Sequence, residues 1–406
     1  MIKRKYFDQL VKHLDSPEKE YLILSGARQT GKTVLLKQVL DHLNEKKEKV
    51  FYFTLEDSTI KMALNQHPEN IFRFIPKNFD SRVYLLIDEI QYLDDPSNFL
   101  KYHYDLYAPG LIVVAAGSSA FYIDEKFADS LAGRKKLIEI YTMDFDEFLV
   151  FRNGGSLLQE LQMIRENPDY ISLKRNDLLA SLDEYLTYGG YPAVVLAEGH
   201  DLKKARLREL LTSYLKRDIL ESGIKSEETL LNLLKILADG QNNLVNKNEL
   251  SVTLRVSTTA IENYLLVLKK CFHVILVKPY FTNVRKELTK MPVVYFHDLG
   301  FRNVLNNMFG QINDRMDKGA IIENYIFIRL REKYRDNEIH YWRTADGNEV
   351  DFVINEGEMK FAIESKFDHN QFKPGKYKKF TEAYPDFPLH CRAYKADNNL
   401  NHILGL

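Results

Sequence analysis

A glycine-rich segment between an apolar strand and an amphipathic helix constrains the fold more than any other feature. It runs from Gly26 to Thr33 and reads GARQTGKT, which is the Walker A pattern Gly-x-x-x-x-Gly-Lys-Thr. The apolar run Tyr21 to Leu24 precedes it, and Val34 to Leu43 follows with apolar residues at helical spacing. Glycines let backbone N–H groups turn inward and approach an anion without a Cβ in the way. The segment therefore predicts a phosphate-binding loop after a buried strand.

The residue types of this loop predict ATP with magnesium as its ligand. Lys32 would reach the β- and γ-phosphates, and the Thr33 hydroxyl would ligate magnesium. The helix that starts at Gly31 adds the positive end of its dipole. We expect the nucleotide contacts to come from the whole loop: Gly26, Ala27, Arg28, Gln29, Thr30, Gly31, Lys32 and Thr33.

Two adjacent carboxylates, Asp88 and Glu89, close the apolar run Val83 to Ile87. A carboxylate at the C-terminal end of a parallel strand points into the ligand crevice. Asp88 would hold the magnesium through water, and Glu89 would polarise the attacking water. The pair therefore indicates hydrolysis of ATP in addition to binding. The alternative is an ordinary solvated strand end.

Two further residues are weaker candidates for the same site. Ser118 follows the apolar run Leu111 to Ala116 and would touch the γ-phosphate or orient the water, although Gly-Ser-Ser is also ordinary turn chemistry. Arg134 would stabilise charge on the transferred phosphoryl group, either in cis or from a neighbouring subunit. In the second case the active form is an oligomer. A surface arginine is the alternative for Arg134.

Residues 1–143 alternate strand and helix signals, with further strands expected at Val50 to Phe53 and Leu137 to Met143. Continuous apolar strands separated by helices predict an α/β fold, a parallel sheet with helices on both faces. Residues 144–224 read as a helical linker or lid region. We expect two further domains, at residues 225–290 and 291–406.

The segment 225–290 carries ten Lys and Arg against six Asp and Glu in a chain of net charge −1. It predicts two helices, Asn248 to Leu254 and Ser257 to Lys270, then a strand, Phe272 to Val277, and a basic wing, Asn283 to Lys290. This order is typical of a winged helix-turn-helix. DNA binding stays open, because the second helix offers no arginine for base edges. The alternative is a packing module that relays the state of the ATPase.

The last third predicts a hairpin of two strands, Glu349 to Ile354 and Lys360 to Lys366, after a long helix, Gly319 to Tyr334. The alternation places Asp351 on one face of the first strand. Glu364 and Lys366 share a face of the second, and Glu323 on the helix would add another carboxylate. The alternative is an amphipathic hairpin that carries charges only because one face is wet.

Composition excludes several classes of protein. A net charge of −1 provides no global field toward nucleic acid or membranes. Two distant cysteines, Cys271 and Cys391, cannot form a disulfide framework or a zinc knuckle. The charged start MIKRKYFDQL has no secretory apolar region, and the apolar run Leu111 to Ala116 is too short to span a bilayer. We expect a cytoplasmic protein without a membrane segment.

Together these segments resemble the prokaryotic AAA-type ATPases of the P-loop class whose C-terminal half is a domain of unknown function. Ala27 and Thr30 depart from the proline and valine usual there, at positions without a chemical role. The resemblance extends over nearly the whole chain and implies ATP hydrolysis. It rests on GARQTGKT, YLLIDEIQYL, AAGSSA, LAGR, the turn Tyr188 to Pro192, Tyr214-x-x-Arg217-Asp218, Tyr295-Phe296-x-Asp298-x-Gly300, Glu323-Asn324, Tyr341-Trp342-Arg343, Glu349-Val350-Asp351 and Glu364-x-Lys366.

The hairpin in addition resembles the PD-(D/E)xK nuclease superfamily. That resemblance implies that Asp351 and Glu364 hold magnesium and that Lys366 orients the attacking water. Three readings of the whole chain follow. The first is an ATPase that moves a nuclease-like or nucleic-acid-binding domain. The second is an ATP-dependent switch or scaffold that binds a protein partner, and the third is a DNA-binding regulator without cleavage.

Overall fold

The computed structural model forms two compact units. Unit 1 comprises Met1–Thr142 with Lys270–Phe272, and unit 2 comprises Met143–Lys269 with His273–Leu406. The structure describes residues 2–17, 20–117, 131, 133–222, 224, 226–239, 244–281 and 290–406, without the side chains of residues 153 and 214–222. Of the four domains expected from the sequence, the last three lie in unit 2, apart from Lys270–Phe272. The boundaries between these three domains therefore stay predictions. Among the described residues, no helix is long and apolar enough to cross a membrane.

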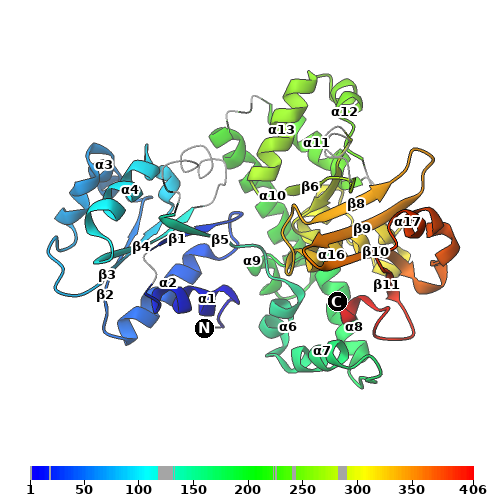
Figure 1. The fold of residues 1–406 in the computed structure, drawn as a ribbon. Helices are drawn as coiled ribbons and strands as arrows, with labels where there is room; N and C mark the ends of the chain where they lie inside the picture. The colour runs from blue at the N-terminus through cyan, green and yellow to red at the C-terminus, as the bar shows by residue number, and fades with distance from the viewer. Residues whose placement is uncertain are drawn as a thin grey trace. The chain divides into compact units, whose positions relative to one another are not determined.

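A five-stranded parallel sheet forms the centre of unit 1, as predicted (Figure 1). Its order is β2-β3-β4-β1-β5, so β4 lies between the strand before the glycine-rich loop and the strand that ends in Asp88. The strands are β1 (Tyr21–Ser25), β2 (Lys49–Thr54), β3 (Val83–Asp88), β4 (Leu111–Gly117) and β5 (Lys135–Glu139).

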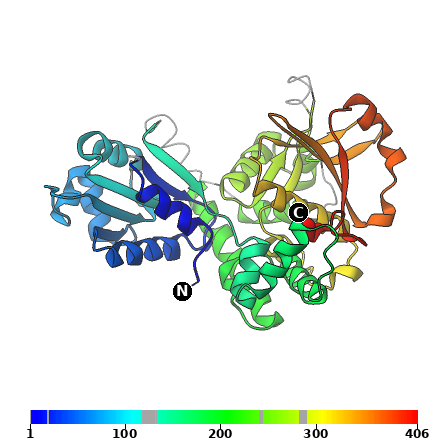
Figure 2. The same ribbon diagram turned by 60° about the horizontal axis from the view of Figure 1, so that its bottom comes forward.

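Helices cover both faces of this sheet, which is why its three inner strands, β3, β4 and β1, are mainly apolar and buried along their whole length (Figure 2). Leu22 and Leu24 pack under the first two helices, whereas Tyr21 and Ile23 face the opposite layer. The helical segments are α1 (Tyr6–Leu14), α2 (Lys32–Glu45), α3 (Ser58–Gln66), η1 (Pro68–Arg73), η2 (Ile90–Tyr92) and α4 (Pro96–Tyr107).

The fifth strand begins and ends earlier than the expected range Leu137 to Met143. The backbone N–H of Ile140 donates a 2.6 Å hydrogen bond to the carbonyl of Ser25, beyond the last strand residue, Glu139. Ile140 and Met143 are buried, but Leu137 is 44% exposed. The expected range Leu137 to Met143 therefore includes the second half of the edge strand β5 and the buried residues that follow it.

Unit 2 contains most of the helices. They are α6 (Phe145–Asn153), α7 (Ser156–Glu166), α8 (Arg175–Tyr188), α9 (Pro192–Val195), α10 (His200–Ser222), α11 (Glu227–Asp239), α12 (Lys247–Leu254), α13 (Thr258–Lys270), α15 (Leu299–Leu305), α16 (Lys318–Arg331) and α17 (Lys378–Ala383). Short 3₁₀ turns lie at η3 (Ile312–Asp314), η4 (His369–Gln371), η5 (Pro374–Tyr377) and η6 (Ile403–Gly405).

Two small sheets complete unit 2. The first pairs β6 (Val274–Val277) with β7 (Val293–Phe296) in antiparallel fashion. The second has the order β11-β10-β9-β8 and consists of β8 (Ile339–Arg343), β9 (Glu349–Glu356), β10 (Met359–Asp368) and β11 (Leu389–Lys395). The predicted hairpin is therefore the central antiparallel pair of this sheet, β9 and β10.

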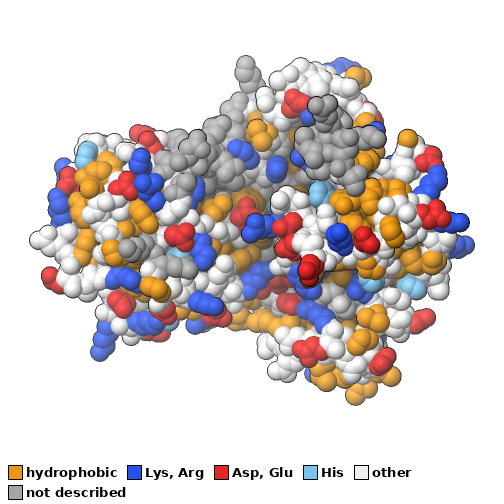
Figure 3. All heavy atoms as spheres, viewed as in Figure 1, with side chains coloured by type: hydrophobic (Ala, Val, Ile, Leu, Met, Phe, Trp, Pro, Cys, Tyr) orange, Lys and Arg blue, Asp and Glu red, His pale blue; other side chains and the backbone are white. Residues whose placement is uncertain are grey.

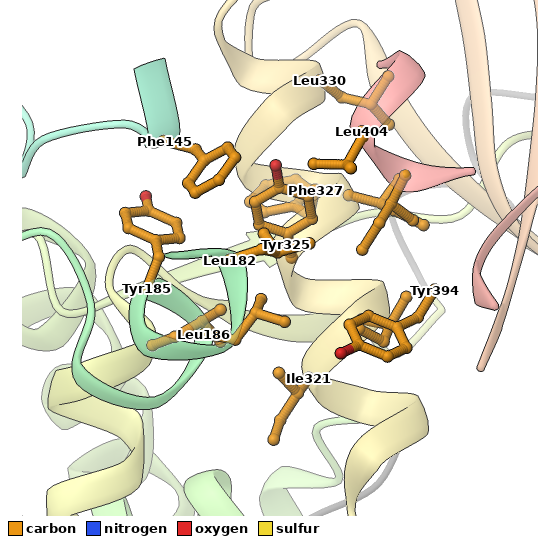
Figure 4. Close-up of a cluster of buried hydrophobic side chains, with 14 of the residues drawn as sticks. Phe145, Leu182, Tyr185, Leu186, Ile321, Tyr325, Phe327, Leu330, Tyr394 and Leu404 are labelled. Atoms are coloured by element: carbon orange, nitrogen blue, oxygen red, sulfur yellow. The ribbon is translucent and has the colours of Figure 1, made fainter. Parts of the chain in front are cut away.

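Helix α16 crosses the core of unit 2 (Figure 4). Its Tyr325 packs edge-on against Tyr185 of α8, with the ring centroids 6.1 Å apart. Phe145 lies within 5.6 Å of the same Tyr185 ring. Helix α16 contacts β10 as well, so the helical layer and the second sheet share one core.

A glycine turn and one aspartate join distant segments of unit 2. Asp298 accepts a 2.7 Å hydrogen bond from the N–H of Gly190 and one of 2.9 Å from Phe301. A Cβ on Gly190 would lie 1.9 Å from the Met143 carbonyl oxygen, and one on Gly300 would lie 2.0 Å from that of Tyr188. The backbone at Gly190 and Gly300 has no room for a side chain. The motif residues Gly190, Asp298 and Gly300 therefore hold the packing of unit 2 together.

Both expected helices of the helix-turn-helix are present as α12 and α13. Arg255, between them, has a left-handed backbone with φ of 55° at a position where glycine costs less. Of the expected wing, residues 283–289 lie outside the described part of the chain, and only Lys290 is described. The winged-helix assignment stays a prediction.

Candidate functional site

The glycine-rich loop joins the end of β1 to the start of α2. A Cβ on Gly26 would lie 2.0 Å from the carbonyl oxygen of Ile140, so the loop passes too close to β5 for any side chain there. Gly31 has φ of 95°, and Gln29 has φ of 55° without being glycine. The loop is therefore curled so that the N-terminus of α2 opens onto it.

Lys32 is 5% exposed and lies over the loop. Its ammonium group donates hydrogen bonds of 2.8 Å to the Gly26 carbonyl and 2.7 Å to the Ala27 carbonyl. The Thr30 hydroxyl donates to the Ala27 carbonyl as well, at 2.9 Å. These contacts hold the ammonium group against the backbone of the loop.

Arg4 supports the loop from outside, and the sequence carried no signal for it. Its guanidinium group donates to the carbonyl of Thr30 and, at 2.9 Å, to that of Tyr141. Arg4 is 4% exposed. It therefore ties the loop to the segment after β5.

The two motifs predicted to bind magnesium meet in the structure. The Thr33 hydroxyl donates a 2.6 Å hydrogen bond to Oδ2 of Asp88, and the Tyr52 hydroxyl donates to the same oxygen at 3.2 Å. Burial raises the pKa of Asp88, whereas the hydrogen bond from Thr33 lowers it. Burial and the charge of Asp88 raise the pKa of Tyr52. A cation held there would meet hard oxygen ligands.

Glu89 follows in a left-handed backbone conformation, with φ of 56° and ψ of 45°. For a residue with a Cβ, this conformation costs about 1 kcal/mol or more, and such strain clusters at functional sites. The amide of Gln91 donates to the Glu89 carboxylate. Gln91 was not predicted, but it orients the expected general base.

The candidate Ser118 lies outside the described residues. Strand β4, which it follows, lies between β1 and β3, and Gly117 is paired with Ser25 at the mouth of the loop. The expected role of Ser118 stays a prediction.

Arg134 directly precedes β5, at the end of the parallel strands where β1 begins. Its carbonyl accepts a 2.9 Å hydrogen bond from the N–H of Tyr21, the first residue of β1. The loop leaves the opposite end of β1, after Ser25, four residues and roughly 13 Å further on. The Arg134 side chain points to Asp105 of α4, with Nε 2.8 Å from Oδ1. Action in cis on the loop is therefore contradicted by the strand direction, and action in trans stays a prediction.

The carboxylates of the second candidate site are buried. Asp351, on β9, is 8% exposed, and Glu364, on β10, is 2% exposed. The N–H and hydroxyl of Ser365 donate to Asp351 at 2.7 and 2.6 Å, and Lys366 donates to Glu364. The alternative of a solvated face is therefore wrong, because α17 and η5 cover this face and form an apolar cluster with it.

The negative charge of Asp351 raises the pKa values of the two other carboxyl groups, Glu364 and Glu323. Burial, followed by the charge of Asp351, raises the pKa of Glu364 to about 8, and Lys366 opposes this shift. Burial and the same aspartate raise the pKa of Glu323, which accepts a 2.6 Å hydrogen bond from Tyr295. In the described part of the chain, no three His, Cys, Asp or Glu residues are arranged to hold a metal ion.

Family models match three successive stretches of the chain. Residues 18–149 match a model described as an AAA domain. Residues 179–311 match a domain of unknown function (DUF8612), and residues 318–401 match another (DUF4143).

The chain is similar to proteins described only as uncharacterized. One, from Methanocaldococcus jannaschii, is 26% identical over 90% of this chain and 79% of its own length. Another, from Haemophilus influenzae, is 27% identical over 91% of this chain and 87% of its own length. The similarity includes both units.

Among solved structures, the RuvB Holliday junction branch migration motor of Thermotoga maritima is 16% identical, with a TM-score of 0.34 over 71% of this chain and 95% of RuvB. AMPPCP-bound DnaA from Aquifex aeolicus is 15% identical, with a TM-score of 0.32 over 66% of this chain and 89% of DnaA. The parallel sheet and the glycine-rich loop thus lie in the part of the chain that matches the AAA domain model, and segments that match two domains of unknown function follow.

Proposed function

We propose that unit 1 hydrolyses ATP with magnesium and that this reaction controls unit 2. The hydrogen bond between Thr33 and Asp88 carries the proposal, because it joins the end of the loop to the carboxylate strand. Magnesium, when bound, would neutralise charge that develops on the transferred phosphoryl group. Thr33 and Asp88 would hold it, and the whole loop would bind the phosphates.

Each remaining residue has a defined task. Lys32, whose ammonium group lies beside the loop, would stabilise charge on the γ-phosphate. Glu89, oriented by Gln91, would accept a proton from the attacking water. Ser118 would orient that water or the γ-phosphate from the end of β4.

Phosphate release from ATP tests this proposal. We expect Glu89→Gln to bind ATP with magnesium but to hydrolyse it about 100-fold or more slowly, as removal of a general base does. Lys32→Ala should lose binding as well. Glu56→Gln, at an exposed glutamate beyond β2, should behave as the wild type. Wild-type protein that binds ATP but releases no phosphate would contradict hydrolysis.

For unit 2 we propose a nuclease-like site at Glu323, Asp351, Glu364 and Lys366. Its support is the ion pair between the buried Glu364 and the half-buried Lys366, beside the buried Asp351. Magnesium is commonly held by one or two carboxylates plus a substrate phosphate, so Asp351 and Glu364 suffice as protein ligands. Lys366 would orient the attacking water.

Incubation with single-stranded and duplex DNA and with RNA, each with magnesium or manganese, tests this second proposal. We expect cleavage by the wild type and a loss of about 100-fold or more in Glu364→Gln and Lys366→Ala, with ATPase activity retained. The matched control is Glu358→Gln, in the exposed turn between β9 and β10. If none of these nucleic acids is cleaved, unit 2 is a binding module for a protein partner or for DNA.

A further inference from the structure

Two adjoining hollows lie on unit 2 between the helix-turn-helix and the second sheet. The first, here the lysine hollow, has a volume of about 550 Å³ and lies beside α12, α13 and β6. The second, here the tryptophan hollow, has a volume of about 610 Å³ and is bounded by Phe281 and Trp342. Lys290 and Met291 line both hollows, so the two form one groove.

Backbone pairing holds the two walls of this groove together. The N–H of Tyr280 donates to the carbonyl of Tyr341 at 2.6 Å, and the N–H of Tyr341 donates to that of Lys278 at 3.2 Å. The chain after β6 therefore runs along β8 for a short distance. Since these bonds fix the walls relative to each other, the groove is a built feature of unit 2.

The lysine hollow is strongly basic in a chain that is close to neutral. One glutamate, Glu262, lines it and pairs with Lys247 at 2.7 Å. No carboxylate of the described residues forms an ion pair with the other three lysines. The four basic residues of this hollow are Lys247, Lys269, Lys278 and Lys290.

The tryptophan hollow is mainly apolar and leads to the carboxylates. Leu244 and Phe281 line it together with Trp342, which is 6% exposed and packs edge-on against Phe380, and Arg343 adds a positive charge. Tyr341 and Arg343 also line a much smaller hollow that contains Glu323, Glu349 and Asp351. The groove thus runs from four lysines, past an apolar wall, to the nuclease-like site.

We propose that this groove binds single-stranded nucleic acid and delivers it to the carboxylates of unit 2, which rests on the nuclease-like function proposed above. Lysines along a track neutralise successive phosphates. The apolar wall suits the faces of unstacked bases, which a duplex keeps inside its stack. The volume of the tryptophan hollow falls in the usual range for small-ligand sites, about 300–1,000 Å³.

Trp342 offers a direct readout, because it is the only tryptophan in the chain. Titration of the intact protein with oligothymidylate of about 20 nucleotides, in EDTA and without ATP, should quench its fluorescence, since bases that enter the hollow lie against this wall. A free tryptophan derivative corrects for absorption by the DNA. Saturating binding without any change in Trp342 emission would overturn the proposal.

Charge removal gives a second, independent test by fluorescence anisotropy of the labelled oligonucleotide. Lys269→Ala combined with Lys278→Ala should weaken binding about ten-fold or more at low salt. Two phosphate contacts at about 0.7 each should also lower the salt slope of log K by about 1.4. The control pair, Lys101→Ala with Lys235→Ala, removes the same charge at exposed positions outside the groove and should bind as the wild type.

The outcomes separate this groove from the proposed cleavage. EDTA prevents metal-dependent hydrolysis, so strand binding that is lost in the groove variants supports the groove even if no nucleic acid is ever cleaved. Equal affinity for duplex DNA, or equal competition by polyglutamate of matched charge, would overturn the assignment to single strands. Cleavage that persists in the groove variants with unchanged affinity would overturn the groove and leave the nuclease-like site standing.

Discussion

The hydroxyl of Thr33 lies 2.6 Å from Oδ2 of Asp88, across 55 positions of sequence. The contact links the N-terminus of α2 to the end of β3 although β4 separates their strands in the sheet. It brings together two oxygen groups that the sequence assigned to one magnesium ion.

Replacement of Thr33 by valine should uncouple magnesium from nucleotide binding. Valine keeps the shape of threonine but lacks the hydroxyl that contacts Asp88. We expect the magnesium affinity of the ATP complex, measured by titration calorimetry, to fall about 10- to 100-fold. Thr33→Ser retains the hydroxyl and should stay close to the wild type. Equal magnesium affinity in the valine and serine variants would remove Thr33 from the site.

Gly26→Ala should destabilise unit 1, because the new Cβ would lie 2.0 Å from the Ile140 carbonyl oxygen. Overpacking of this kind typically costs about 1–3 kcal/mol. Urea unfolding followed by circular dichroism would measure the loss. Gly375→Ala is the control, because no heavy atom of the described residues lies within 4 Å of a Cβ there. An unchanged midpoint for Gly26→Ala would mean that the loop can move away from β5.

Arg134→Ala distinguishes a residue that acts in trans from a surface arginine paired with Asp105. We expect the single variant to lose ATPase activity and an equimolar mixture with Lys32→Ala to regain some of it. Random pairing into two-fold dimers would restore about a quarter of the wild-type rate, because only mixed dimers combine one intact loop with one arginine. Wild-type activity in Arg134→Ala alone would assign it to the surface pair.

Asp317 should make unit 2 sensitive to acid. Burial alone would raise its pKa, but hydrogen bonds from Arg315 and Arg302, each 2.7 Å to Oδ2, lower the pKa to about 2. A depressed pKa stabilises the fold above the ordinary value of 3.8, and that contribution disappears as the pH falls toward 2. The shift corresponds to about 2 kcal/mol.

The test compares urea unfolding of the wild type with that of Asp317→Asn between pH 2 and pH 6. We expect the variant to lose about 3 kcal/mol or more at pH 6, because two buried arginines lose their partner. The difference should shrink below about pH 4. Asp314→Asn, at an exposed neighbour, is the control. A difference that does not change with pH would contradict the ionised buried pair.

Local pattern predicted the elements that hold the glycine-rich loop and Asp88, because these residues lie next to strand ends. The loop, Lys32, Thr33 and Asp88 lie where alternation of strand and helix placed them. Arg4 and Tyr52 were missed, since each reaches the site from a position without a motif. The misplaced fifth strand shows the same limit, because buried residues after Glu139 continue its apolar pattern.

The sequence alone determined that a strand, a glycine-rich loop and a helix follow one another and end in a phosphate-binding arrangement, because that chemistry depends on adjacent backbone groups. Tertiary structure decided which remote segments of the chain lie side by side and which side chains they bury. The parallel pairing of β1 with β5 placed Arg134 at the end of the strands opposite the loop, and packing of η5 on the second sheet placed Tyr377 against the buried Glu364. Strand order and burial depend on contacts between remote segments, which no local spacing encodes.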